Sequence, residues 1–568
     1  MRFLSALLPS LLALPAAASF TQSWHKSGPN YVTLGSNGRF AFNGSEFPII
    51  GTTAYWLPAL NKDEDIDYAL GNISSAGFNA VRTWAFNDVT SIPENGTWFQ
   101  LITNRGLFIN NGPNGLQKLD TVVRLAEKHH LFLILTLTNN WNPEPADSIV
   151  NLPINFTTRN LFNPSLQRNF LSNQYGGMDV YVRQLGDLHL HDQFYLNKTL
   201  INAFKNYTTH VVKRYRDCPN VLSWEIANDP RCKSTLRTSE ACATTTVTRW
   251  HSNIAKHVKT VDPNHLVSSG TSGYFCPDCP KIFQKKKPSP PTVSPIPSPS
   301  TIARRRLPKP LTKKSLLNEK WNLLKRVNSE EAATRTGSAD VIRIRGRWLA
   351  TPTKRQQGAG VGPAFNGASG VDSEDILAIP QVGFGSFQLF PDQYQYGLVE
   401  PSGPLTANES LQVGLNWIQQ QADSSKRNGK PIILTSFGLV TQNNAAAFVP
   451  FNASAPVIGT EILADANPQQ QASFGVSDQQ RDQTYAQWIE ASLRNGLAGV
   501  IHYQWGQPGL SVQPGTPVSS PSNQTGVSTV QNATGVSPND GYSIQGVGSP
   551  QFVQVVQQQQ AIFGANPA

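Results

Sequence analysis

The chain has 568 residues, of which 39% are hydrophobic and 15% are charged, and its formal net charge is +10. Nineteen lysines and arginines between Lys281 and Arg355 stand against four acidic residues, so this segment carries +15 and the rest of the chain about −5. A basic balance suggests an anionic partner. This segment contains no base-reading motif, so nucleic acid is not an expected partner.

The first residues have the three regions of a secretory signal peptide: Met1-Arg2 is charged, residues 3–15 are mostly apolar, and Ala16-Ala17-Ala18 are small. We expect residues 1–18 to be a signal peptide, cleaved after Ala18. The alternative is a retained signal anchor, for which the apolar run is too short. No later segment has the roughly 18 consecutive apolar residues of a membrane span, so we expect a secreted, extracellular protein without membrane contact.

Eight short apolar runs then recur along the chain, separated by segments long enough for helices. Helical spacing of apolar residues is clearest over residues 64–76 and 116–126. This alternation predicts an α/β fold, the (β/α)8 TIM barrel with parallel strands. The predicted strands are residues 47–56, 80–84, 131–138, 221–227, 265–269, 383–390, 431–437 and 499–505.

Residues 281–362 separate the fifth predicted strand from the sixth. They contain Lys285-Lys286-Lys287, a Pro/Ser run over residues 288–300 and further basic tracts. Such a composition cannot bury enough apolar surface to fold alone, so it predicts a disordered basic insertion, within which a helix over 316–327 could form. The alternatives are a solvated linker, a segment removed by proteolysis, or a binder of anionic polymer.

The insertion divides the predicted barrel, and a second low-complexity segment follows it. We expect strands one to five within residues 19–280 and strands six to eight within 363–511. Residues 512–538 are rich in Ser, Pro, Gly and Gln. Residues 539–568 are expected to form the C-terminus with a closing helix over 551–563.

Five cysteines are an odd number for an oxidising compartment, so one is expected to stay unpaired. Cys232 and Cys242 would close a short loop. Cys276 and Cys279 form either a loop disulfide or half of a metal site, although no second CxxC or His pair accompanies them. Cys218 is the candidate free thiol, and neither a metal nor another cofactor is expected.

Ten Asn-x-Ser/Thr sequons predict a glycan-coated surface for a secreted protein. They are at Asn43, Asn72, Asn95, Asn155, Asn197, Asn206, Asn408, Asn452, Asn523 and Asn532.

Active sites of barrels lie at the carboxyl ends of the strands, and several polar motifs follow the apolar runs there. The motifs are Arg82-Thr83-Trp84, Thr138-Asn139-Asn140-Trp141, Tyr175-Gly176-Gly177-Met178-Asp179, His191-Asp192-Gln193-Phe194-Tyr195 and Trp224-Glu225-Ile226-Ala227-Asn228-Asp229-Pro230. Taken in this order they resemble the fungal endo-β-1,4-mannanases of glycoside hydrolase family 5. The resemblance spans nearly the whole chain except the insertion and the low-complexity tail.

The resemblance implies cleavage of β-1,4-mannosidic bonds with retention by two glutamates, an acid/base after strand four and a nucleophile ending strand seven. The family's Asn-Glu-Pro stands here as Asn228-Asp229-Pro230, and its Glu-Phe-Gly as Ser436-Phe437-Gly438. Aspartate keeps the carboxyl on a side chain shorter by about 1.5 Å. A serine without an adjacent base is a poor nucleophile and supplies no negative charge. We therefore expect Asp229 and Ser436 at the catalytic positions, with weakened or absent catalysis.

Other positions of the family pattern are changed or kept. The family's His-Leu-Tyr stands here as Gln388-Leu389-Phe390, and its Phe-Trp-Gln as His502-Tyr503-Gln504. By resemblance, the residues expected to bind the sugar are Arg82, Trp84, Asn139, Asn140, Asn228, Gln388, Phe390, Tyr503 and Trp505. The plainer alternatives are that Arg82 pairs with an acid inside the barrel and that Trp84 or Trp505 belongs to the core. Glu225, deeper along strand four, is interpreted as structural.

Two functions remain open. The first is a secreted endo-1,4-β-mannosidase-like hydrolase that acts on β-mannan, with Asp229 as the acid and either a water or another carboxylate in place of the nucleophile. Glu461 and Asp465 are the nearby candidates for the base that such a water needs. The second is a catalytically inactive barrel that binds β-mannan or another cell-wall polysaccharide. We expect a monomer in either case.

Overall fold

The structure is a computed structural model. It describes residues 30–35, 38–142, 171–283, 343–344, 347–348, 362–394, 396, 405–448, 475–516, 535–545 and 549–563. The predicted signal peptide, most of the insertion and its possible helix over 316–327 lie outside these residues. So do the candidate bases Glu461 and Asp465.

Eight parallel strands form the centre of the molecule, in the spatial order β11-β10-β9-β5-β4-β16-β15-β14. A parallel bridge between Ser268 and Phe384 joins the two outer strands, and the N–H of Gly383 donates to the carbonyl of Val267 over 2.8 Å. The sheet therefore closes into the predicted barrel. Its strands are β4 (Ile49–Thr53), β5 (Ala80–Trp84), β9 (Phe132–Thr136), β10 (Val221–Glu225), β11 (Leu266–Ser268), β14 (Gly385–Leu389), β15 (Ile432–Phe437) and β16 (Gly499–His502).

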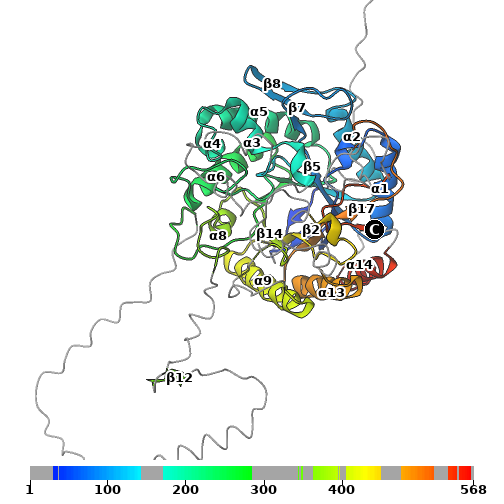
Figure 1. Cartoon of the computed structure of the whole chain (residues 1–568), viewed down its shortest axis with the longest axis vertical. Helices are drawn as coiled ribbons and strands as arrows, with labels where there is room; N and C mark the ends of the chain where they lie inside the picture. The colour runs from blue at the N-terminus through cyan, green and yellow to red at the C-terminus, as the bar shows by residue number, and fades with distance from the viewer. Residues whose placement is uncertain are drawn as a thin grey trace, which may run out of the picture. The chain divides into compact units, whose positions relative to one another are not determined.

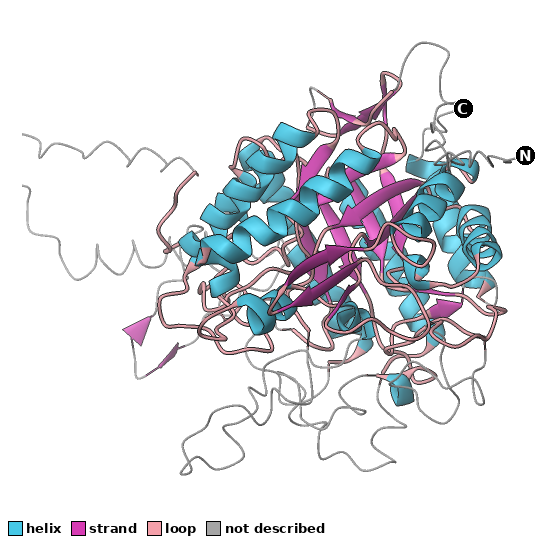
Figure 2. Ribbon diagram, turned by 90° about the horizontal axis from the view of Figure 1, so that it is seen from above, coloured by secondary structure: helices cyan, strands magenta, loops and turns pink. Residues whose placement is uncertain are grey.

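The main helices lie around the strands (Figure 2). Their buried faces are apolar, as in α2, where Leu116, Leu119, Val122, Val123 and Ala126 are all buried, and this burial against the strands stabilises the helices. The longer helices are α1 (Asp63–Ser75), α2 (Leu116–Lys128), α3 (Met178–Leu185), α5 (Lys198–Tyr215), α6 (Thr244–Val261), α9 (Ala407–Asn428), α13 (Asp478–Arg494) and α14 (Pro550–Phe563).

Shorter helical segments lie in the connections between the strands. They are η1 (Leu57–Ala59), η4 (Leu171–Tyr175), α4 (Gln193–Leu196), α8 (Ser373–Leu377) and η5 (Ala445–Ala447).

A small antiparallel sheet lies at the amino end of the barrel, formed by β1 (Thr33–Leu34), β2 (Phe40–Phe42) and β3 (Ser45–Glu46). Phe40 from this sheet contacts Phe384 edge-to-face, and Phe42 contacts Phe132 in the same way, with ring centroids 5.0 Å apart in both pairs. These rings fill the amino end of the barrel interior with apolar side chains.

Further strands extend the loops. The connection after β5 forms a three-stranded sheet of β6 (Asp88–Val89), β7 (Gln100–Thr103) and β8 (Gly106–Ile109), which is labelled in part in Figure 1. After β16 the chain forms β17 (Trp505–Gly506), which pairs with β18 (Ile544–Gln545). Residues 285–359 form a separate unit, in which β12 (Arg343–Ile344) and β13 (Arg347–Trp348) pair as an antiparallel hairpin.

The cysteines pair as the sequence suggests. Cys232 is bonded to Cys242 and Cys276 to Cys279, and Cys218 is free. Of the two alternatives for Cys276 and Cys279, the structure therefore confirms the disulfide and not half of a metal site. In the described residues no cluster of three or more His, Cys, Asp or Glu side chains is arranged to hold a metal ion.

Candidate active site

Arg82 lies at the centre of the carboxyl end of the barrel and is almost fully buried. Its guanidinium donates to Glu225 at 2.5 and 3.1 Å and to the amide oxygen of Asn228 at 2.8 Å. Glu225 also accepts from the hydroxyl of Thr136 at 2.9 Å. Arg82 thus pairs with an acid inside the barrel, and its ion pair joins strands β5, β9 and β10.

The asparagines predicted to bind sugar are held by one another and by the backbone. Asn228 donates to Asn139 over 2.8 Å, and Asn139 donates to Asn173 over 2.8 Å. Asn140 accepts from the N–H of Arg231 at 2.9 Å and donates to the carbonyl of Lys233 at 2.9 Å. Asn228 keeps part of its surface exposed, whereas Asn139 and Asn140 are buried. Asn228 is therefore the member of this trio that a ligand can reach most directly.

Asp229, at the acid/base position, is engaged on both carboxylate oxygens. Arg231 donates to one oxygen at 2.8 Å, and the indole of Trp141 donates to the other at 3.0 Å. Burial would lower the pKa of Arg231, but the charge of Asp229 and two nearby tyrosines hold it well above its ordinary value. A general acid must donate a proton to the leaving oxygen, whereas this carboxylate accepts hydrogen bonds from its neighbours.

Ser436, at the nucleophile position, is the last residue but one of strand β15 and is buried. Its hydroxyl lies 3.5 Å from a terminal nitrogen of Arg82. Arginine stays protonated in proteins and cannot accept a proton from this hydroxyl. On the neighbouring strand, Gln388 donates to Asn228 over a long 3.3 Å.

The aromatic members of the predicted set lie on the β14 and β16 side. Tyr503 contacts Phe390 edge-to-face with ring centroids 5.6 Å apart, and it stacks on Tyr55 at 6.3 Å. The phenol of Tyr503 donates to Asp540 over 2.7 Å. Burial raises the pKa of Asp540 to about 7 and, with the charge of Asp540, raises that of Tyr503 well above its ordinary value. A phenol of raised pKa is a weak nucleophile.

The two predicted tryptophans are packed inside the protein. Trp84 stacks on Phe86 and Tyr55 with centroids 5.4 and 6.0 Å apart, and its indole donates to the carbonyl of Ser172. Trp505 is fully buried and lies edge-on to Phe78 at 6.0 Å. These contacts fit the core alternative for both rings.

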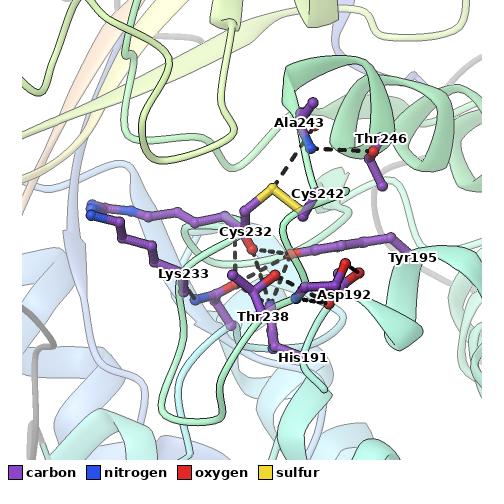
Figure 3. Close-up of a disulfide and its surroundings, with 12 residues drawn as sticks. His191, Asp192, Tyr195, Cys232, Lys233, Thr238, Cys242, Ala243 and Thr246 are labelled. Atoms are coloured by element: carbon purple, nitrogen blue, oxygen red, sulfur yellow. Dashed lines mark hydrogen bonds between the residues drawn. A yellow bond between two sulfur atoms is a disulfide. The ribbon is translucent and has the colours of Figure 1, made fainter. Parts of the chain in front are cut away.

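The loop that carries Asp229 is tied down beyond the barrel. The Cys232–Cys242 disulfide closes it, and His191, Tyr195 and Thr238 surround the disulfide in Figure 3. Asp192 accepts from the hydroxyl of Thr238 at 3.1 Å and from Ser239 at 2.6 Å. The motif around His191 noted in the sequence therefore braces this loop.

Sequence reasoning missed some of the groups at this end of the barrel. Arg231 lies against the rings of Tyr274 and Tyr394 at 4.7 and 5.2 Å, and it holds Asp229. Asp540 binds Tyr503 from the C-terminal segment. Arg231 follows directly on Asn228-Asp229-Pro230, and this position in the sequence could have identified it as a site residue. Asp540 lies in a segment with no local pattern that points to the barrel.

Fold and site together describe an eight-stranded parallel barrel with buried acids, amides and an arginine at its carboxyl end, which is where the active sites of barrel enzymes lie. Residues 30–290 match the family model described as "GH family 5 beta-mannosidase-like". The chain is 34% identical over 238 residues to mannan endo-1,4-beta-mannosidase F of Aspergillus fumigatus, which covers 41% of this chain and 45% of that protein. It is 32% identical over 274 residues to mannan endo-1,4-beta-mannosidase A of Podospora anserina, with 48% and 60% covered. The match thus spans about half the length of these relatives.

Solved structures support the fold. The endo-1,4-beta-mannanase from Rhizomucor miehei aligns with a TM-score of 0.55 at 22% identity, covering 94% of this chain and 99% of that one. The endo-beta-1,4-mannanase from Thermotoga petrophila gives 0.52 at 20% identity, with 93% and 79% covered. The resemblance predicted from the sequence is confirmed over residues 30–290, which match the mannosidase-like model of glycoside hydrolase family 5 and align with its fungal members.

Proposed function

We propose that this protein recognises β-1,4-mannan at the carboxyl end of its barrel, as a mannan endo-1,4-β-mannosidase-like protein that no longer runs the two-carboxylate retaining mechanism. Asn228 and Gln388 offer amide groups that both donate and accept hydrogen bonds, which suits sugar hydroxyls. The curated relatives are named for action on mannan, and this supports the choice of polysaccharide.

The main support for this proposal is the identity of the group that pairs with Arg82. In the described residues the carboxylate that binds Arg82 belongs to Glu225, at 2.5 Å, and the strand-seven position offers a serine hydroxyl at 3.5 Å. A retaining glycosidase needs a second carboxyl about 5–5.5 Å from the acid, to attack the anomeric carbon. Ser436 supplies neither the negative charge nor an activated nucleophile, so the covalent step loses its central group.

A second candidate is slow hydrolysis with Asp229 as the acid. Asp229 remains a carboxylate at the end of strand β10, which favours this candidate. Against it, Arg231 and Trp141 occupy both of its oxygens. Hydrolysis would require the aspartate to leave these partners and take up a proton.

We also propose that the protein acts outside the cell. Two disulfides support this, because such bonds persist in oxidising compartments. Within the described residues no helix combines the length and apolar character of a membrane span. Sequencing the N-terminus of protein recovered from a culture medium tests this location, with Ser19 expected as the first residue.

Product analysis tests the central proposal. Purified protein is incubated with mannohexaose, and insoluble mannan is used in a parallel sedimentation assay. We expect protein to sediment with mannan while mannohexaose stays intact. Cleavage by the wild type that is lost in Asp229→Ala would establish the second candidate instead, and absence of both sedimentation and cleavage would overturn the proposal. Cellulose in the same assay measures the preference for mannan.

A further inference from the structure

Two buried aspartate–histidine pairs with the same geometry lie at opposite ends of the barrel. His191 Nδ1 lies 2.6 Å from Asp179, and His265 Nδ1 lies 2.5 Å from Asp262. None of the four side chains is exposed. In each pair the other ring nitrogen lies 3.0 Å from a backbone carbonyl, of Arg231 for His191 and of Cys218 for His265.

The pairs differ in what they hold. Asp262 and His265 lie at the amino end, between helix α6 and the start of strand β11, and Asp262 accepts from the indole of Trp224 at 2.7 Å. The amino end of a barrel is where polar contacts serve stability. Asp179 and His191 lie beyond strand β9, at the carboxyl end, beside the loop that carries Asp229.

The Asp179–His191 pair and its neighbours hold the backbone of Arg231. The carbonyl of Arg231 lies 3.0 Å from His191 and accepts from Tyr195 at 2.8 Å, and the N–H of Arg231 donates to Asn140 at 2.9 Å. Ser234, three residues further on, donates to Asp179 at 2.7 Å. The loop is thus held at both Arg231 and Ser234.

The side chain of Arg231 connects this fixed backbone to Asp229 at the candidate active site. That guanidinium binds Asp229 at 2.8 Å, and Asp229 has a positive φ of 53°. A left-handed conformation is uncommon for residues other than glycine, although aspartate adopts it more readily than most, and suitable surroundings help to hold it. The fixed backbone of Arg231 supplies such surroundings two residues away.

The charges of both aspartates are retained despite burial. Burial would raise the pKa of Asp179, but attraction and a hydrogen bond from His191 hold it below its ordinary value. Burial likewise acts on Asp262, whose pKa is lowered by its bonds with His265 and Trp224. The two pairs are therefore matched in chemistry and burial and differ in position.

We propose that Asp179 and His191 are positioning residues of the sugar site: through the backbone of Arg231 they set the place of Asp229 and of the 229–234 loop. Asp262 and His265, by contrast, contribute to stability alone. The expected effect on mannan affinity rests on the mannan-binding function proposed above. The expected effect on the 229–234 loop does not depend on a ligand.

The test compares matched variants of the full chain, Asp179→Asn and His191→Gln against Asp262→Asn and His265→Gln. Melting temperature, mannohexaose affinity well below melting, and backbone hydrogen exchange over 229–234 are measured for each. We expect all four to melt earlier. The first two alone should also weaken affinity about tenfold or more, near 1.4 kcal/mol, and speed exchange in the loop.

Equal affinity and equal loop exchange in the folded Asp179 and His191 variants would overturn the inference, because the pair would then only stabilise. If the wild type binds no mannohexaose, the proposed function fails, and loop exchange alone decides the positioning role. Should the Asp179 and His191 variants not fold, Ser234→Ala replaces them, since it removes only the hydroxyl bonds to Asp179 and Asn140. Faster loop exchange in that variant supports the inference, and unchanged exchange contradicts it.

Discussion

The two sides of the barrel's carboxyl end satisfy their polar groups differently. On the side of β5, β9 and β10, Arg82, Glu225 and Asn228 are joined by contacts of 2.5 to 3.1 Å. On the side of β14 and β15, Gln388 and Ser436 reach this network at 3.3 and 3.5 Å. The side of β5, β9 and β10, called the ordered side below, contains its own acid, Glu225. The pairing of Arg82 therefore does not depend on a carboxylate from strand β15. Loss of a nucleophile can therefore leave the frame of a sugar site in place.

The largest expected effect comes from restoring both carboxylates of the family pattern. The double variant Ser436→Glu with Asp229→Glu places an acid beside Arg82 and a longer one at the end of β10. We expect mannohexaose cleavage to rise by several orders of magnitude, because the retaining route regains both its groups. Product chromatography measures it, with each single variant as control. A double variant as inert as the wild type would show that the frame has also been lost.

The next effect tests the ordered side itself. Glu225→Gln leaves the buried Arg82 without its anion, and breaking a buried pair costs about 3–5 kcal/mol. We expect the free energy of unfolding in urea to fall by that order, whereas Ser436→Ala should change it by less than about 1 kcal/mol. Similar losses in the two variants would remove the contrast between the sides.

A pH effect of middle size is expected at Asp540, on the β16 side. Its folded pKa of about 7 lies above the value of about 3.9 in the unfolded chain. The folded state therefore binds more protons between these values, and stability falls as pH rises from about 4 to about 7. Asp540→Asn should flatten this fall by up to about 4 kcal/mol, as measured by urea unfolding at several pH values. An unchanged slope would assign the effect to other groups, such as Asp392, whose pKa burial raises to about 7.

The smallest effect is expected at Gln388. Its bond to Asn228 is long, and Gln388→Ala should weaken mannohexaose binding by no more than about 1 kcal/mol. Asn228→Ala, which also cuts contacts to Arg82 and Asn139, should cost more. Calorimetry on the two variants compares the sides directly, and a larger loss for Gln388→Ala would reverse their ranking.

Much of the fold could be predicted from the sequence, because each barrel strand is a local run of apolar residues. All eight predicted strands are present, although residues 47–56 shorten to β4 (Ile49–Thr53) because the chain turns into a short helix at Leu57. The short loop between Cys232 and Cys242 also predicts their disulfide, whereas for Cys276 and Cys279 the sequence left half of a metal site as the alternative.

The partners within the site could not be predicted in the same way. The acid that holds Arg82 lies 143 residues away in the chain. The sequence indicates a structural role for Glu225 but does not identify this partner. Asp540, which accepts a hydrogen bond from Tyr503, lies in a segment without a barrel pattern. The contact between His191 and the carbonyl of Arg231 depends on how a loop folds back. Contacts of this kind come from tertiary structure and leave no periodic signal in the chain.

The most direct test of the account is a calorimetric titration of the wild-type protein with mannohexaose, followed by recovery and sizing of the ligand. We expect saturable binding and a hexasaccharide that is recovered whole. Absence of binding, or recovery of shorter mannosides, would contradict the claim that this barrel has kept mannan recognition and lost the retaining mechanism.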